Sequence, residues 1–282
     1  MNLDYKQKRP RIHFINTKST IAIERKGDDM RATTSRLQQS VKAYFGRVAD
    51  MWHQTGRALA YYGKGRFCPV CGRSSRRFCK AGPQKREDAR CVHCGALERH
   101  RLLWLYLAKR TDLFDGKPKK MLHVAPEPCF VSRLKQRLGN NYSTADLLDP
   151  LVMVKMDITN IEYPDESFDV IYCSHVLEHV QDDRKAMREF YRVLGTKGWA
   201  ILLVPITAEK TFEDPSIVEA QERLRLFGQH DHVRKYGPDY VDRLREAGFV
   251  VETTKVNNLV TKDEAVRMGL TVASGEIYYC TK

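Results

Sequence analysis

Four cysteines stand in two matching motifs, Cys68-Pro-Val-Cys71 and Cys91-Val-His-Cys94, which lie about 20 residues apart. A glycine directly follows each motif, and glycine readily takes the left-handed conformation that closes a tight turn. Two such turns can direct four thiolates at one ion, in a tetrahedral zinc site with Zn–S distances of ~2.3 Å. Because four protein ligands leave no open position on the ion, the spacing predicts a structural zinc site.

Two alternatives accompany this prediction. The four cysteines could be reduced structural residues without a metal, and His93, inside the second motif, could compete as a ligand. The symmetry of the two motifs favours Cys68, Cys71, Cys91 and Cys94 as the ligands. Between the motifs, the arginine-rich stretch 73–90 is either a solvated loop that offsets thiolate charge or a surface that contacts phosphates.

A second group of titratable residues lies in the run 228–234, Gly-Gln-His-Asp-His-Val-Arg. His230 or His232 could remove a proton from an acceptor, with Asp231 orienting the imidazole. The structural alternative is a lid in which these polar side chains bond one another. The residue types therefore indicate candidate general bases.

The segment from Ser167 to Ile206 indicates the elements that would position such groups. It predicts a buried strand over Phe168–Cys173, an amphipathic helix over Asp183–Leu194 and a second buried strand over Trp199–Ile206. Near-continuous apolar strands are typical of parallel sheets that are covered on both faces. Strands and helices alternate along residues 121–281, which predicts an α/β fold with a doubly wound, mostly parallel sheet.

One stretch of this segment resembles a known family: FDVIYCSHVLEHV, followed by a helix and then RVLGTKGW. It is similar to the half of class I S-adenosylmethionine-dependent methyltransferases that follows the cofactor-binding turn, and the resemblance covers about residues 120–282. It implies a Rossmann-like sheet of seven strands, S-adenosylmethionine as the cofactor and methyl transfer as the reaction. Alignment and desolvation can supply much of the rate of such an in-line displacement, so a general base is needed only for a poor nucleophile.

In that family the first strand ends in an acidic residue and a glycine-rich turn, which contacts the methionine part of the cofactor. The matching stretch here is Met-Leu-His-Val-Ala-Pro-Glu-Pro, residues 121–128. His123 stands in place of the acidic residue, while Ala125, Pro126 and Glu127 replace the glycines, and proline offers no N–H. The stretch either holds the cofactor differently, with Glu127 accepting from its ammonium group, or binds it weakly or not at all.

The resemblance also implies roles for polar residues at later strand ends. Asp146 would accept hydrogen bonds from the ribose hydroxyls, Asp157 would contact the adenine amino group, and Ile158 would pack on the adenine ring. Ser174 and His175 end the fourth strand, beside the expected position of the sulfonium. The alternative for both aspartates is that they only cap turns.

Three further residues are expected to be structural. Glu178 and His179 follow the fourth strand, where a lone histidine is more often a hydrogen-bonded structural residue than a base. The resemblance also favours a structural role for His232, because a histidine before the last helix is common among family members with different substrates.

Charge is unevenly distributed along the chain. The 282 residues carry a formal net charge of +13, with 48 basic and 35 acidic side chains. Residues 1–100 contain 22 basic and 8 acidic residues, so the remainder is close to neutral. Such asymmetry predicts RNA or another anionic partner for residues 1–100, and the alternative is that the basic residues only keep this part soluble.

The chain is expected to contain four parts: a basic segment over 1–30, with either a hairpin or no fixed structure; a helical segment over 31–65; a zinc ribbon with a docking helix over 66–115; and a methyltransferase-like domain over 116–282. No apolar run approaches the roughly 18 residues needed to cross a bilayer, and the N-terminus lacks the apolar region of a secretory signal. We therefore expect a cytoplasmic protein without a membrane partner, in which cysteines stay reduced.

Three functions are compatible with these features. The first is S-adenosylmethionine-dependent methyl transfer to an unidentified acceptor. The second is an RNA methyltransferase whose basic zinc module binds the substrate. The third is a zinc-containing binding protein that has lost catalysis, which the replaced glycines at residues 125–128 favour.

Overall fold

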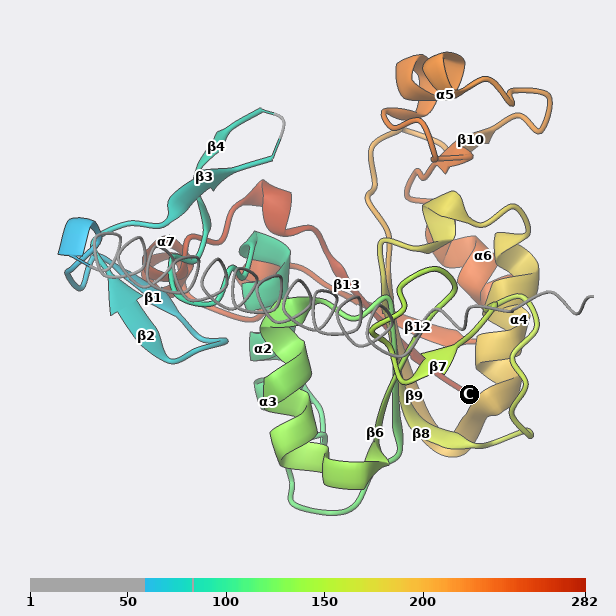
Figure 1. The fold of residues 1–282 in the computed structure, drawn as a ribbon, viewed down its shortest axis with the longest axis horizontal. Coiled ribbons are helices and arrows are strands. Elements are labelled where there is room, and N and C mark those ends of the chain that lie inside the picture. Colours follow the sequence, from blue (N-terminus) through green and yellow to red (C-terminus); the bar gives the residue numbers. More distant parts are fainter. Residues whose placement is uncertain (1–58, 83) are drawn as a thin grey trace, which may run out of the picture. The chain divides into compact units, whose positions relative to one another are not determined.

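A seven-stranded sheet lies at the centre of the part that the computed structural model describes, residues 59–82 and 84–282 (Figure 1). Its strand order is β12-β13-β9-β8-β5-β6-β7, and all neighbours are parallel except β13, which is antiparallel to both of its neighbours. The strands are β5 (Met121–Val124), β6 (Tyr142–Asp146), β7 (Val154–Lys155), β8 (Phe168–Ser174), β9 (Leu194–Leu203), β12 (Val250–Thr254) and β13 (Ile277–Thr281). The predicted doubly wound, mostly parallel seven-stranded sheet is confirmed.

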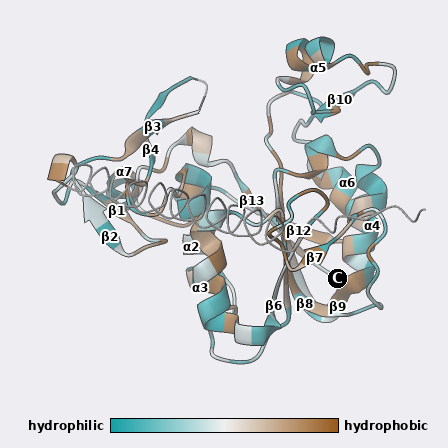
Figure 2. Cartoon of the chain, in the orientation of Figure 1, coloured by the Kyte–Doolittle hydropathy of each residue, from teal (hydrophilic) through white to brown (hydrophobic). Residues whose placement is uncertain are grey.

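Helices cover both faces of this sheet, as its apolar strands require. Figure 1 shows α2 (Glu98–Arg110) and α3 (Pro128–Leu138) on one side, and α4 (Asp183–Val193) and α6 (Tyr240–Glu246) on the other. In Figure 2 the central strands are mainly hydrophobic and the outer helix faces are mainly hydrophilic. The 3-10 turns are η1 (Gly139–Asn141), η2 (Leu177–His179), η3 (Val256–Asn258) and η4 (Val272–Ser274).

The helix α4 shows how the sequence specifies these elements. Asp182 caps it, because its side chain accepts a hydrogen bond from the backbone N–H of Lys185 at 2.8 Å. Its buried residues recur at helical spacing and face the sheet: Ala186, Met187, Phe190 and Val193. The predicted amphipathic helix is therefore present.

Strand register brings the functional ends of the strands together. Val124 at the end of β5 pairs with Ala145 of β6 and with Cys173 of β8, and Ser174 pairs with Leu203 of β9. Because these strands are parallel, their carboxyl ends meet at one edge, where open α/β sheets bind ligands.

Two small hairpins precede the sheet; the first contains the motif Cys68–Cys71, and the motif Cys91–Cys94 directly follows the second. The hairpins are β1 (Arg66–Cys68) with β2 (Arg73–Ser75) and β3 (Cys79–Ala81) with β4 (Arg86–Arg90). Cys68 and Val70 of the first hairpin, Phe78 before the second and Cys91 after it belong to the same hydrophobic cluster as the sheet and α2. Residues 61–282 accordingly form one compact unit.

The chain after β9 supplies the remaining elements. These are β10 (Phe212–Glu213), α5 (Ala220–Phe227), β11 (Arg234–Lys235) and α7 (Lys262–Met268). No helix among the described residues is long and apolar enough to cross a membrane. The segment expected over 1–30 and almost all of the expected helical segment lie outside the described residues.

Candidate functional site

The turn after β5 takes a backbone conformation that normally favours glycine. Ala125 has a φ of +48°, and its N–H donates to the carbonyl oxygen of Ala145 at 2.8 Å. This left-handed conformation is uncommon for a residue with a Cβ atom. The turn therefore keeps a glycine-type geometry although alanine occupies the position.

A buried polar network stands behind this turn. His123 is fully buried, with Nδ1 2.7 Å from the Tyr142 hydroxyl and Nε2 2.8 Å from Glu127 Oε2. The hydroxyl of Tyr172 donates to Glu127 Oε1 at 2.8 Å. Three strands and the following turn thus fix the Glu127 carboxylate at the edge of the sheet.

The network keeps Glu127 ionised. Burial disfavours the charged carboxylate, but the hydrogen bond and charge of His123, together with His100 and Tyr172, outweigh it and lower the pKa of Glu127 to about 2. Its side chain is 13% exposed. A negative charge is therefore present beside the strand end although residue 123 is not acidic.

Asp146 and Asp157 both accept hydrogen bonds within turns, as expected if they cap those turns. Asp146 Oδ1 accepts from the backbone N–H groups of Leu148 and Asp149 at 2.7 and 2.9 Å. Asp157 Oδ1 accepts from the backbone and the hydroxyl of Thr159, each at 2.8 Å. Among the described residues neither Oδ2 atom has a hydrogen-bond partner, so each aspartate can still accept from a ligand.

Ser174, His175 and Ile158 also lie near this edge. Ile158 is buried, while His175 has a φ of +58° and its Nδ1 lies 3.0 Å from the Ser174 hydroxyl. Burial lowers the pKa of His175 to about 3, and the charge of Arg99 adds to this effect. His175 is therefore a neutral, polar residue at neutral pH.

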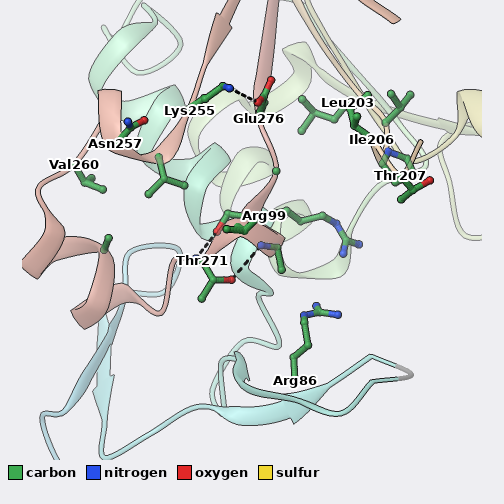
Figure 3. Close-up of a pocket in the computed structure, with 18 of the residues that line it drawn as sticks. Arg86, Arg99, Leu203, Ile206, Thr207, Lys255, Asn257, Val260, Thr271 and Glu276 are labelled. Atoms are coloured by element: carbon green, nitrogen blue, oxygen red, sulfur yellow. Dashed lines mark hydrogen bonds and ion pairs between the residues drawn. The ribbon is translucent and has the colours of Figure 1, made fainter. Parts of the chain in front are cut away.

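A cavity of about 1020 Å³ opens beside His175. Its walls come from the end of β9 and residues 204–207, from residues 255–276, and from Arg86 and Arg99. Figure 3 shows the Arg99 side chain extending into this space, and Lys255 Nζ paired with Glu276 Oε1 at 3.0 Å. A space of this size can hold a small-molecule acceptor or one residue of a larger one.

The two candidate bases differ in their surroundings. His230 is exposed, whereas His232 is 7% exposed and its Nδ1 lies 3.3 Å from the carbonyl oxygen of Phe227. Asp231 was expected to orient one of these rings, but its Oδ2 lies 3.1 Å from Nδ1 of His179. The expected pairing is wrong because the chain turns so that Asp231 faces η2.

Sequence reasoning missed that Glu178 and His179 meet His232. The three residues bring potential ligand atoms within 4.8 Å of one another. Burial raises the pKa of Glu178 to about 7. The pairing joins residues more than 50 positions apart, and the adjacent Glu-His pair was the only signal in the sequence.

The four motif cysteines converge on one point. Sγ of Cys68 lies 3.7 Å from Sγ of Cys94, Sγ of Cys71 lies 3.8 Å from Sγ of Cys91, and all four sulfurs lie within 4.8 Å of one another. Tetrahedral zinc with Zn–S bonds of ~2.3 Å has sulfur–sulfur edges of ~3.8 Å. The donor set therefore fits one zinc ion.

The surroundings of the cysteines agree with this donor set. The glycine after each motif is left-handed, with φ of +68° at Gly72 and +74° at Gly95. Their N–H groups donate to the carbonyl oxygens of Cys68 and Cys91 at 2.9 and 3.0 Å. His93 Nε2 instead lies 3.2 Å from the carbonyl oxygen of Ser74, which removes it from the cluster.

Buried histidines make stability depend on pH. Burial lowers the pKa of His100 to about 4, so the unfolded chain binds more protons between pH about 6.5 and 4. Stability is then fully present above this window and is lost as pH falls through it. We expect His100→Gln to flatten the decline of unfolding free energy across this range in denaturant titrations. Metal release in acid should affect the unchanged protein and His100→Gln alike. If unfolding free energy declined equally steeply with falling pH in both, His100 would not be the group responsible.

Comparison with known proteins agrees with the topology. Residues 109–202 match a family model described as a methyltransferase domain. Together with the sheet topology, this match supports the predicted methyltransferase-like fold of this part of the chain. It identifies no acceptor.

Curated relatives match only parts of the chain. Ajmaline N-methyltransferase from Rauvolfia serpentina is 27% identical over 126 residues, which are 44% of this chain and 40% of that protein. The uncharacterized methyltransferase YcgJ from Bacillus subtilis is 40% identical over 76 residues, which are 27% of this chain and 28% of that protein. The chain thus spans less than half of the length of either relative.

Solved structures show a distant likeness. A S-adenosylmethionine-dependent methyltransferase from Mesorhizobium loti aligns with a TM-score of 0.42 and 14% identity, over 60% of this chain and 95% of that one. YcgJ from Bacillus subtilis aligns with a TM-score of 0.35 and 16% identity, over 62% of this chain and 93% of that one.

Proposed function

We propose that this chain transfers a methyl group from S-adenosylmethionine to an acceptor that carries negative charge, and that a structural zinc ion stabilises it. One observation carries the proposal: a glycine-type turn, two aspartates with an unused oxygen and a neutral histidine meet at one sheet edge, beside a large cavity. The proposed cofactor contacts are Ala125, Glu127, Asp146, Asp157, Ile158, Ser174 and His175, and the buried His123 positions Glu127.

The turn after β5 would contact the cofactor differently from the glycine-rich turn of the family. The left-handed Ala125 lets the backbone approach a ligand as glycine does, and the ionised Glu127 provides the charge that an ammonium group needs. His123 acts through Glu127, since its hydrogen bond positions that carboxylate. Asp146 and Asp157 would hold the ribose and adenine through their Oδ2 atoms.

The bound cofactor would supply an electrophilic methyl group on a sulfonium. The chain's own residues would align the acceptor with that group and exclude water, which can provide much of the rate of an in-line displacement. Burial and the neutral state of His175 suit a site beside a cation. His230 and His232 are not needed as bases where the acceptor is a good nucleophile.

The charges of the cavity support an anionic acceptor. Its walls contain four basic side chains and the acidic Glu276. Lys255 is paired with Glu276, and Arg86 donates to the buried Glu98 at 3.0 and 3.2 Å. In the described part of the chain, Arg99 and Lys262 have no such partner, so they are the cations that an acceptor would meet.

A tritium label tests this acceptor class. We expect the methyl group of S-[methyl-³H]-adenosylmethionine to enter extract components that an anion exchanger retains. We also expect Arg99→Met to reduce the transfer at least fivefold, while Lys255→Met, whose charge is already paired, changes it little. Label that appears only in unretained components would contradict the proposal.

The second candidate is RNA methylation, which the basic residues 1–100 favour. The hairpins present several exposed cations, namely Arg73, Arg76, Arg77, Lys80, Lys85 and Arg90. RNA would make the retained label sensitive to ribonuclease, and binding would weaken steeply with added salt. Label that resists ribonuclease would leave a smaller anionic acceptor.

Replacing Asp146 tests the cofactor contacts. We expect Asp146→Ala to weaken S-adenosylmethionine binding by roughly 1–3 kcal/mol, because a buried hydroxyl pair loses its acceptor. The matched control is Asp149→Ala, since Asp149 also caps a turn in the same loop, with Oδ1 2.8 Å from the N–H of Leu151. Calorimetric titration compares the two, and equal losses would assign Asp146 to the turn alone.

A further inference from the structure

Two histidines and one glutamate from separate segments meet beyond the end of β8. Glu178 and His179 belong to η2, and His232 lies before β11. One ligand atom from each lies within 4.8 Å of the other two. The N–H of Val233 donates to the carbonyl oxygen of Glu178 at 2.9 Å, which ties the two segments together.

Hydrogen bonds orient both imidazole rings. Nδ1 of His179 lies 3.1 Å from the carboxylate of Asp231, and Nδ1 of His232 lies 3.3 Å from the carbonyl oxygen of Phe227. Such acceptors place the proton on Nδ1 and leave Nε2 with its lone pair. Metal-binding histidines almost always hold their second nitrogen in this way, on a carboxylate or a backbone carbonyl.

The glutamate provides an independent sign of a missing partner. Glu178 is 2% exposed, and its buried Oε2 atom has no hydrogen-bond partner among the described residues. A buried carboxylate oxygen without a donor is costly, and buried charges are normally paired or bound to a metal. A cation held between Glu178 and the two imidazoles would remove that cost.

We propose that Glu178, His179 and His232 bind one divalent first-row transition-metal ion. Two imidazoles and a carboxylate suit Mn²⁺, Fe²⁺, Co²⁺ or Zn²⁺. Three protein ligands leave open positions on the ion, unlike the four thiolates of the cysteine site. An acceptor oxygen could occupy such a position. That role would rest on the proposed methyl transfer, whereas binding of the ion does not.

Mn²⁺ is a selective probe for this site over the cysteine site, because thiolates favour softer ions. Zinc also fills the cysteine site before the titration. In titrations followed by electron paramagnetic resonance, we expect zinc-loaded protein to bind one Mn²⁺ per chain. Glu178→Gln keeps the shape of the side chain, and we expect it to weaken Mn²⁺ binding at least tenfold, as we expect for His232→Ala. His230→Ala is the matched control and should bind Mn²⁺ like the unchanged protein.

Two results would overturn the proposal. One is that the unchanged protein binds no Mn²⁺ at millimolar concentration. The other is that His230→Ala and His232→Ala have the same affinity. Circular dichroism checks that each variant is folded. If His232→Ala fails to fold, the half-buried His179→Gln replaces it, and the same tenfold loss is required.

Discussion

Removal of zinc is expected to unfold the cysteine hairpins and to destabilise the whole described unit. Four thiolates within 4.8 Å repel one another without a cation, and structural zinc sites contribute about 10 kcal/mol or more of binding free energy. The loss should extend to the sheet, because the hairpins and the sheet share one hydrophobic cluster. Cys91→Ser should have the same effect as a strong chelator.

Two measurements check this prediction. A chromophoric chelator should titrate one zinc per chain from the unchanged protein and none from Cys91→Ser. Thermal unfolding should move to much lower temperature in the variant, while Cys79→Ser, outside the cluster, should change it little. A protein that contains no zinc, or that melts alike with and without chelator, would contradict the zinc assignment.

Replacing Arg101 is expected to have the second largest effect. Arg101 lies on α2 with no exposed surface, and its guanidinium donates to the backbone carbonyl oxygens of Asp88, Ala89, Ala96, Met268 and Gly269. It also lies over the ring of Phe78, 4.3 Å from its centroid. The side chain therefore joins the second cysteine motif to the segment after α7.

Arg101→Met keeps the volume but removes the guanidinium donor from these carbonyl groups, of which that of Ala96 also accepts from the N–H of Cys91 at 2.9 Å. The expected cost is roughly 3–5 kcal/mol. Arg110→Met is the matched control, because Arg110 lies on the same helix, is exposed and donates to one carbonyl oxygen at 3.3 Å. Its change should stay within about 0.5 kcal/mol. Denaturant unfolding at fixed zinc compares the variants, and similar losses for both would show that Arg101 carries no special role.

The sheet could be predicted because its strands are apolar on both faces. The expected strand Phe168–Cys173 is β8, which extends by one residue to Ser174. Strand ends were less predictable: β9 starts at Leu194 instead of Trp199, since backbone pairing of Leu194 with Phe168 extends it through polar residues. β7 contains only Val154 and Lys155, because at the sheet edge it pairs only with the end of β6. The hydrophobic pattern of a sequence does not indicate where backbone pairing between neighbouring strands begins and ends.

The site was only partly predictable for a similar reason. Cysteine spacing carries its own geometry, so the sequence alone predicted the four sulfurs that converge. The charge on Glu127 depends on Tyr172 and His123, which belong to different strands and meet only through their register. Likewise, Glu178 reaches His232 only because β11 returns beside η2.

Calorimetric titration of zinc-loaded protein with S-adenosylmethionine is the direct test of the proposed cofactor binding. We expect one binding site per chain for S-adenosylmethionine and one for the demethylated product, which should also raise the unfolding temperature by mass action. Circular dichroism and zinc content establish that the protein is folded. Binding in the unchanged protein would show that Ala125 and Glu127 form a working substitute for the glycine turn. No heat and no thermal shift at millimolar cofactor would contradict methyl transfer and leave a zinc-containing binding protein.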